Sequence, residues 1–284
     1  MERNKNYVDL RGEFVAAYKE QPSPSLMSFH VHDAYELLFV LSEGVMLSVN
    51  DEEYAVPKGA LLIFNNMDVH RVQSMGSDPY KRFVLWFRRE YLDELGGLSE
   101  KLLRCFYVRG FSGANMLLIP EERQKGMIDR FAALAEVYGN TALRSSAIAK
   151  LRLGELLATV SELYFSRSAV EGEFDMPEQT SVYSALRYIQ ENCTKGITRN
   201  DLEKLTGINK RALCTQFRRL TGASTGQYIL NCRIALAKAY LVQGFSVAEV
   251  CDMTGFENWS NFSRTFRNHV GESPKQYAMR MRGQ

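Results

Sequence analysis

Residues 254–277 read TGFENWSNFSRTFRNHVGESPKQY, and this stretch decides the fold of the C-terminal third. It repeats an earlier stretch, LTGINKRALCTQFRRLTG at 205–222, with the same order of Thr-Gly, spaced apolar residues and glycine. The two Thr-Gly pairs lie 48 residues apart, whereas the matches that follow them, such as Leu213 with Phe262, lie 49 apart. An ordered series of matches with one change of offset indicates a duplicated structural unit.

Each copy has the order of elements of a helix-turn-helix. A capping box, Thr198 to Asp201 in the first copy and Ser246 to Glu249 in the second, predicts the start of a short helix. Gly207 and Gly255 predict its end, because glycine tolerates the positive φ of a tight turn. A second helix follows, with apolar residues four apart facing inward and polar or cationic residues facing outward. In such units the second helix enters the major groove of DNA.

The spacing of the two copies and the charge around them support binding to DNA. A helix capped by Ser224 is predicted to run through YILNCRIALAKAYLVQG and to space the copies rigidly. Residues 177–284 hold 15 Lys+Arg against 8 Asp+Glu, a net charge of +7, whereas residues 1–176 hold 20 against 25, a net charge of −5. Basic helices can be merely solvated, but two motifs in tandem favour a polyanionic partner.

Residues 26–90 show short apolar runs separated by turns. The runs are YELLFVL, GVMLSV, EEYAV, GALLIF and RFVLWF, and the turns are NDEE at 50–53 and PKG at 57–59. Short strands at this spacing predict an all-β sandwich or barrel.

Residues 121–167 change to helical spacing. Two amphipathic helices are predicted, joined near Gly139 and Asn140, and they could cover the strands only or also pair with a second subunit. The segment 166–179 is acidic and lacks periodicity, as expected of a linker. The apolar positions are Met127, Phe131, Leu134 and Val137 in the first helix, and Ile148, Leu151, Leu156 and Val160 in the second.

The composition is that of an ordinary globular protein of 284 residues, long enough for two domains. The N-terminus lacks a signal-peptide core and no apolar run is long enough to span a bilayer, so we predict a cytoplasmic protein. Five cysteines without a CxxC pair predict reduced thiols, with neither a disulfide framework nor a zinc knuckle.

Residues 181–281 resemble the DNA-binding domain of the AraC/XylS family of transcription regulators. The resemblance rests on the two repeated stretches and on RIALAKAYL at 233–241. Family proteins join this domain to an N-terminal cupin-like barrel, for effector binding or dimerisation, and to a helical pair. The fold class implied is α+β multidomain. It divides into a cupin-like sensor barrel over 1–120, a dimerising helical pair over 121–167, a linker over 168–179 and a domain with two helix-turn-helix motifs over 180–284.

The resemblance also implies which residues contact DNA. In the first recognition helix the family usually carries arginine where this chain has Thr215, and a small residue where it has Glu203. Arg264 keeps the corresponding arginine in the second copy, so we expect it to read a guanine, while Arg211 or Lys210 partly substitutes in the first. The implied base-reading positions are Arg211, Cys214, Thr215, Trp259, Ser260, Ser263 and Arg264, and the expected phosphate contacts are Arg218, Arg219 and Arg267.

The stretch HVHDAYE at 30–36 poses a separate question. His30, His32 and Glu36 share a parity and could face one side of a strand, although Asp33-Ala34 makes a regular strand through them doubtful. With the later His70 they resemble the ligand order of cupin metalloenzymes, a plausible set for a divalent transition metal. The Pro-x-Gly usual in such enzymes is missing from ALLIFNNMDV at 60–69. We therefore predict an effector pocket without metal, cofactor or catalytic residue, lined by His32, Glu36, His70, Arg82 and Trp86.

Two functions remain in competition. The favoured one is a sequence-specific transcription regulator that responds to a small molecule through its barrel. The alternative is a metal-dependent cupin enzyme or metal sensor with a basic DNA-binding appendage, but no nucleophile or general-base constellation supports catalysis. The expected partners are double-stranded DNA, a small-molecule effector and a second copy of the chain. The resemblance also allows RNA polymerase as a partner, and no membrane is implied.

Overall fold

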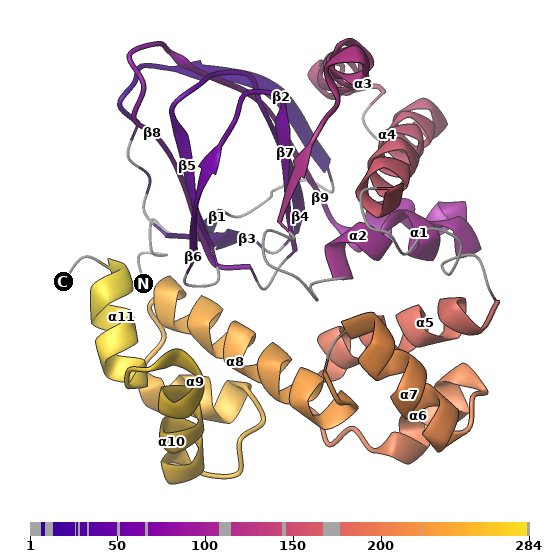
Figure 1. Ribbon diagram of the computed structural model, residues 1–284, viewed down its shortest axis with the longest axis vertical. Coiled ribbons are helices and arrows are strands. Elements are labelled where there is room, and N and C mark those ends of the chain that lie inside the picture. The colour runs from indigo at the N-terminus through magenta and orange to yellow at the C-terminus, as the bar shows by residue number, and fades with distance from the viewer. Residues whose placement is uncertain are drawn as a thin grey trace.

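The computed structural model describes residues 7–8, 14–25, 27, 29–32, 34–49, 52–65, 68–107, 115–143, 146–166, 177–221 and 223–282. The strands gather in one half of the molecule and the helices from α5 onward gather in the other (Figure 1). This order of strands, helical pair and all-helical domain is the order that the sequence predicts.

The strands form two main antiparallel sheets, together called the β domain below. One sheet has the order β10-β7-β4-β9-β2 and the other the order β6-β5-β8, while β1 and β3 pair in parallel. The five predicted runs are strands, whereas β1, β2, β8 and β10 were not predicted. The expected barrel takes the form of two facing sheets. The bounds are β1 Tyr7–Val8, β2 Phe14–Gln21, β3 Val31–His32, β4 Tyr35–Val40, β5 Val45–Val49, β6 Glu52–Val56, β7 Ala60–Phe64, β8 His70–Ser74, β9 Tyr80–Phe87 and β10 Met116–Leu118.

Alternation along the strands gives the β domain two apolar layers. Leu38 and Val84 pack between the sheets with residues of β5 and β8. Their neighbours Leu37 and Leu85 lie on the opposite face, against the helices. Because side chains alternate along a strand, Glu36, Arg82 and Trp86 lie on the inner face with Leu38 and Val84.

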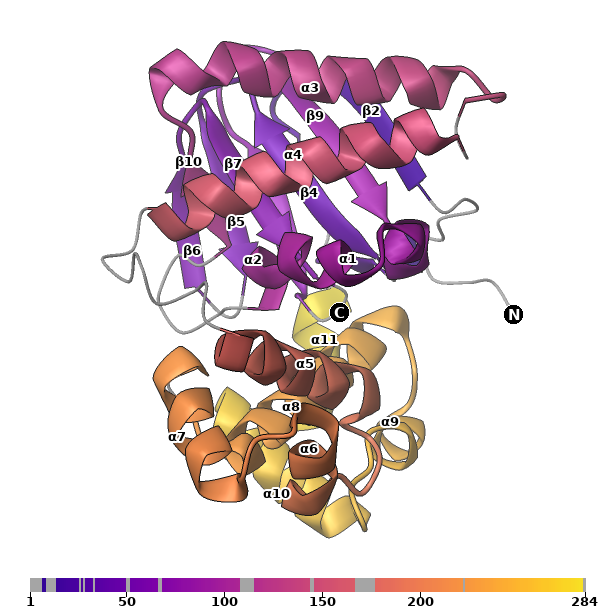
Figure 2. The ribbon, with the colours of Figure 1, turned by 90° about the vertical axis from the view of Figure 1, so that its right-hand side faces the viewer.

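Helices α3 (Glu121–Gly139) and α4 (Ala147–Ser166) lie across the outer face of the five-stranded sheet (Figure 2). All four apolar positions predicted for α3 are buried. In α4 the prediction was wrong for Ile148 and Leu151, which are 51% and 64% exposed. The prediction is confirmed for Leu156 and Val160, which are buried. The α4 segment is apolar on more than one side, so packing rather than periodicity decides which residues of its first turns are buried. That buried face consists of Ala149, Leu153, Leu156, Leu157, Val160 and Tyr164.

Short helices connect the sheet to this pair. They are η1 (Arg89–Leu95), α1 (Gly97–Leu102) and α2 (Arg104–Tyr107). The C-terminal domain follows with α5, which begins at Pro177, inside the predicted linker and before the predicted boundary at 180. Its bounds are α5 Pro177–Asn192, α6 Arg199–Thr206, α7 Lys210–Thr221, α8 Thr225–Gln243, α9 Val247–Met253, α10 Trp259–Val270 and α11 Pro274–Arg282.

Both predicted capping boxes are present. The Thr198 and Ser246 side chains each accept a hydrogen bond from the backbone three residues on, and Asp201 and Glu249 return it. Gly207 caps α6 with φ +69, as predicted. In the second copy Thr254 caps α9 instead, so Gly255, with φ +73, lies one residue beyond the helix. All five cysteines are free, as the sequence predicts.

The two halves contact each other at two places. Helix α5 packs on α1 and α2, and Arg89 lies 3.7 Å from Glu191 across this contact. Farther along α8, Val69 of the β domain joins the apolar cluster of the second motif. No helix among the described residues is long and apolar enough to cross a membrane.

Candidate nucleic-acid interface and effector site

The first recognition helix, α7, is anchored by one face and exposed on the other. Leu213 and Phe217 are buried, and the Phe217 ring packs edge-on against Tyr228 of α8 at 5.3 Å. The side chains of Lys210, Arg211, Thr215 and Arg218 are exposed, and Cys214 is half-buried between the two faces. The side chain of Arg219 lies outside the described residues.

The second recognition helix, α10, repeats this arrangement. Asn258 caps it, and Phe262 and Phe266 are fully buried, with Phe266 5.6 Å from the Tyr277 ring of α11. The opposite face carries the predicted DNA contacts, and Trp259 is 58% exposed there. Ser260, Arg264 and Arg267 are exposed and Ser263 is half-buried.

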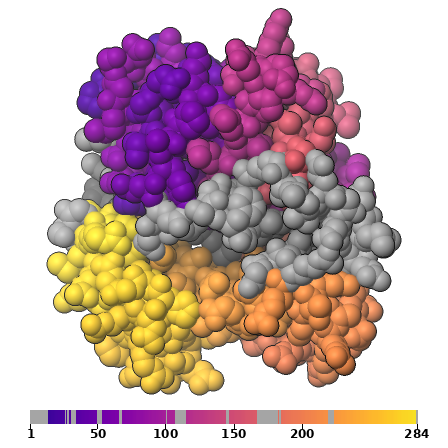
Figure 3. All heavy atoms as spheres, in the orientation of Figure 1, coloured from indigo at the N-terminus to yellow at the C-terminus, as the bar shows by residue number. Residues whose placement is uncertain are grey.

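Helix α8 sets the distance between the motifs. It has 19 residues, so it is about 28 Å long at roughly 1.5 Å per residue. That length is close to one turn of B-DNA, about 34 Å. In the space-filling view, the first motif (orange) and the second (yellow) occupy neighbouring areas of the same surface (Figure 3).

One ion pair distinguishes the first motif from the second. Glu203 of α6 places a carboxylate oxygen 3.7 Å from the Lys210 ammonium at the start of α7. Both side chains are substantially exposed. The acidic residue that departs from the family pattern therefore neutralises part of the cationic face of the first motif.

Inside the β domain, Glu36 and His70 form a buried pair. The His70 Nε2 lies 3.0 Å from a Glu36 carboxylate oxygen, and its Nδ1 lies 2.9 Å from the Asp68 carbonyl oxygen. Both neighbours can accept a hydrogen bond, so each ring nitrogen is placed to donate, and this arrangement favours the protonated imidazole. Burial lowers the pKa of His70, but the hydrogen bond and charge of Glu36 outweigh it and raise the pKa above its ordinary value.

The residues that could bind a metal are only partly those predicted. His30, Glu36 and His70 are buried, and each offers one ligand atom within 4.8 Å of the others. The His32 side chain lies outside the described residues, and β3 ends at this residue before β4 begins, as the doubt about Asp33-Ala34 anticipated. A His70 ring that donates from both nitrogens would have no lone pair left to bind a metal.

Arg82 and Trp86 lie on the same inner face as Glu36. The Arg82 guanidinium donates to the Gln21 side-chain oxygen at 2.7 Å and stacks 4.2 Å from the Tyr80 ring. The Lys19 ammonium lies 4.6 Å from the Trp86 ring. The sequence did not indicate Lys19 because β2 was not predicted, and only the pairing of β2 with β9 sets Lys19 opposite Arg82. It did not indicate Tyr80 because the predicted run RFVLWF begins two residues after Tyr80, at Arg82.

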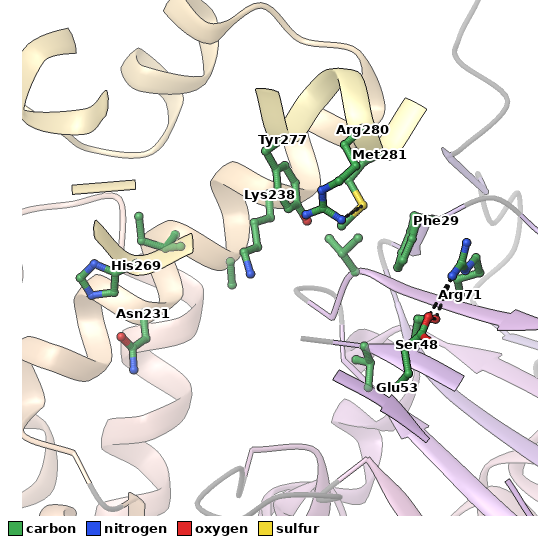
Figure 4. A pocket seen from close by; sticks show the side chains of 14 residues that line it. Phe29, Ser48, Glu53, Arg71, Asn231, Lys238, His269, Tyr277, Arg280 and Met281 are labelled. Atoms are coloured by element: carbon green, nitrogen blue, oxygen red, sulfur yellow. Dashed lines mark hydrogen bonds and ion pairs between the residues drawn. The ribbon is translucent and has the colours of Figure 1, made fainter. Parts of the chain in front are cut away.

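A second feature that the sequence did not predict is a cavity of about 550 Å³ between the β domain and the second motif (Figure 4). Phe29, Val69 and Arg71 line it from the β domain, and Lys238 and Tyr277 line it from α8 and α11. Arg71 is held there by Glu53 at 3.2 Å. Its walls come from segments that are far apart in the sequence, so no local sequence pattern predicts that they meet.

Comparison with known proteins agrees with this architecture. Residues 13–157 match the AraC-like ligand binding domain, and residues 202–280 match a helix-turn-helix domain. The chain is thus a DNA-binding transcription regulator with a ligand-binding domain. It belongs to the AraC family.

Similar proteins cover nearly the whole chain. YbfI, an HTH-type transcriptional regulator of Bacillus subtilis, is 26% identical over 87% of this chain and 85% of its own. The raffinose operon regulator RafR of Pediococcus pentosaceus is 23% identical over 90% and 88%. The crystal structure of ToxT from Vibrio cholerae matches 96% of this chain and 99% of its own, with a TM-score of 0.50 and 15% identity, which supports the fold alone.

Proposed function

We propose that this regulator binds one specific DNA sequence through α7 and α10 and responds to a small polar molecule bound inside the β domain. The observation that carries the proposal is the pair of anchored helices with exposed cationic faces, spaced by α8. Genome-wide mapping of bound DNA tests it, because a regulator of this kind occupies discrete sites that share one sequence. Uniform, sequence-independent occupancy would contradict it.

On this proposal the contacts divide by position along each recognition helix. Residues in the N-terminal part of such a helix reach base edges, which favours base reading by Arg211, Cys214 and Thr215 in α7. Lys210 can contact a base edge only when its ion pair with Glu203 is broken. Arg218, later in α7, is placed to bind a phosphate. In α10 the proposed base readers are Trp259, Ser260, Ser263 and Arg264, and Arg267 binds a phosphate.

The proposed effector site is the inner face around Glu36, His70, Arg82 and Trp86. The sequence also predicts His32 as part of this site, and its side chain lies outside the described residues. We infer that this site does not use a metal or perform catalysis, because the His70 ring already lies against Glu36 through Nε2 and against the Asp68 carbonyl through Nδ1. The effector is therefore bound by hydrogen bonds and stacking.

The proposal extends to assembly and location. Ile148 and Leu151 stand exposed on the outer side of α4, on the helical pair predicted to dimerise. Exposed apolar residues on one helix face favour a partner surface, and paired operators reward a two-fold dimer. We also propose a cytoplasmic protein that works with RNA polymerase, as a regulator of transcription requires.

A further inference from the structure

Two cations inside the β domain form no ion pair with any acidic residue that the structure describes. Lys19 on β2 and Arg82 on β9 pair directly in register, so both side chains leave the sheet on its inner face. Arg82 is only 5% exposed. Among the described residues, no carboxylate lies within 4.0 Å of either cation.

Among the described residues, the carboxylate that acts on both cations is that of Glu36. Glu36 acts electrostatically on Lys19, Arg82 and His70, but its carboxylate is in contact with the His70 ring, 3.0 Å from Nε2. Among the described residues of the inner face, the two cations Lys19 and Arg82 therefore outnumber the one carboxylate, Glu36. Burial is the largest influence on Lys19 and Arg82, and it lowers the pKa of both. A buried charge without a counterion destabilises the folded protein.

Two buried hydrogen-bond donors beside these cations are also unsatisfied. The Arg82 Nη1 makes no hydrogen bond, although its Nη2 donates to Gln21. The hydroxyl of Tyr80, a fully buried residue whose ring stacks on the guanidinium, likewise has no partner. Buried polar atoms without partners are rare in folded proteins and point to a missing acceptor.

The strand that carries Lys19 leaves this region accessible. Strand β2 is at the edge of its sheet, and its inward-facing residues Val15, Ala17, Lys19 and Gln21 are all only half-buried. Trp86, which pairs with Val15, is half-buried too. This half-buried edge, formed by β2 and the indole, is the side from which a ligand would approach Lys19.

We propose that Lys19, Tyr80 and Arg82 bind the carboxylate or phosphate group of a small organic anion. This inference rests on the proposed effector site and names the chemical class of its ligand. One oxygen of the anionic group accepts from Arg82 Nη1 and the Tyr80 hydroxyl, and the Lys19 ammonium donates to a second oxygen of the same group. Charge-assisted hydrogen bonds of this kind are about twice as strong as neutral ones. The remainder of the ligand lies against Trp86.

Calorimetric titration of the full chain at constant ionic strength tests the proposal. The probes are acetate, benzoate, inorganic phosphate and glucose 6-phosphate, with glucose as the neutral control. We expect saturable binding of at least one anion with a Kd below about 10 mM, and none of glucose. The carboxylate and phosphate arms identify the preferred head group. Saturable binding by none of the four anions would overturn the inference.

Three variants locate the binding. Arg82→Gln should weaken it by about 10- to 100-fold, and Tyr80→Phe by about 10-fold. Without ligand, Arg82→Gln should melt at a higher temperature than the parent protein, because the uncompensated charge is gone. Lys81→Gln is the matched control: it lies on the same strand, is half-buried on the other face near Glu20, and should bind like the parent.

Equal affinity in Arg82→Gln and the parent would refute the site, as would a lower melting temperature of ligand-free Arg82→Gln. A gel-shift assay with total genomic fragments, run on the same preparations without anion, separates this failure from failure of the proposed function. If the protein binds DNA but none of the anions, only the anion site is refuted. If the protein binds an anion but no DNA, the anion site is retained and the proposed function as a DNA-binding regulator is refuted.

Discussion

Replacing Arg264 with alanine should remove a base contact and nothing else. The residue is the sixth of α10, in its N-terminal half, and its side chain is exposed. In the described part of the chain it makes no ion pair or hydrogen bond, so its loss should not lower the stability of the fold. A bidentate arginine–guanine contact is worth about 1 to 3 kcal/mol, which corresponds to about a 5- to 150-fold weaker Kd on the specific site.

The assay is a fluorescence-anisotropy titration at several salt concentrations, on the specific site and on random DNA. Arg218→Ala is the control, because Arg218 is equally exposed but is the ninth residue of α7. It should weaken both DNAs alike and lower the salt slope by about one. If Arg264→Ala loses the same affinity on specific and on random DNA, its role as a base reader is wrong.

Three further predictions concern other parts of the chain. Glu203→Gln should free Lys210 and remove a carboxylate from the DNA-facing side, so the affinity for random DNA should rise and its salt slope should steepen by about one; an unchanged slope contradicts this. Since its pairing with Glu36 raises the pKa of His70, that pair stabilises the fold fully below pH 6.5 and progressively less as the pH rises through the folded-state pKa. Urea midpoints should fall above pH 6.5 in the parent, and a His70→Gln variant with the same slope would rule out this origin. Light scattering should find the full chain dimeric at tens of micromolar and Leu151→Glu monomeric; a monomeric parent would exclude self-association through α4.

The helix-turn-helix units were predictable because their signals are local. A capping box, a glycine turn and two apolar residues four apart lie within one motif, and each has a direct physical reading in the sequence. Thr198, Ser246 and the buried pair Phe262 and Phe266 occupy the predicted places. Short-range geometry decides such features, so no tertiary information is needed.

The β domain was less predictable because its chemistry depends on pairing between distant strands. Strand β2, FVAAYKEQ, has too little apolar alternation to be recognised, yet it brings Lys19 beside Arg82. The phase of α4 was wrong at Ile148 and Leu151 because packing against the sheet, not periodicity, selects the buried side of an apolar helix. The cavity at the second motif is likewise a product of tertiary structure alone.

The central claim is that the two motifs read adjacent turns of one DNA duplex. Hydroxyl-radical footprinting of the full chain on a site recovered from genome-wide mapping tests it most directly. Two recognition helices spaced by α8 should protect two segments on the same face of the duplex, about 10 bp apart. Protection of a single major-groove segment, or of two segments on opposite faces, would contradict the account.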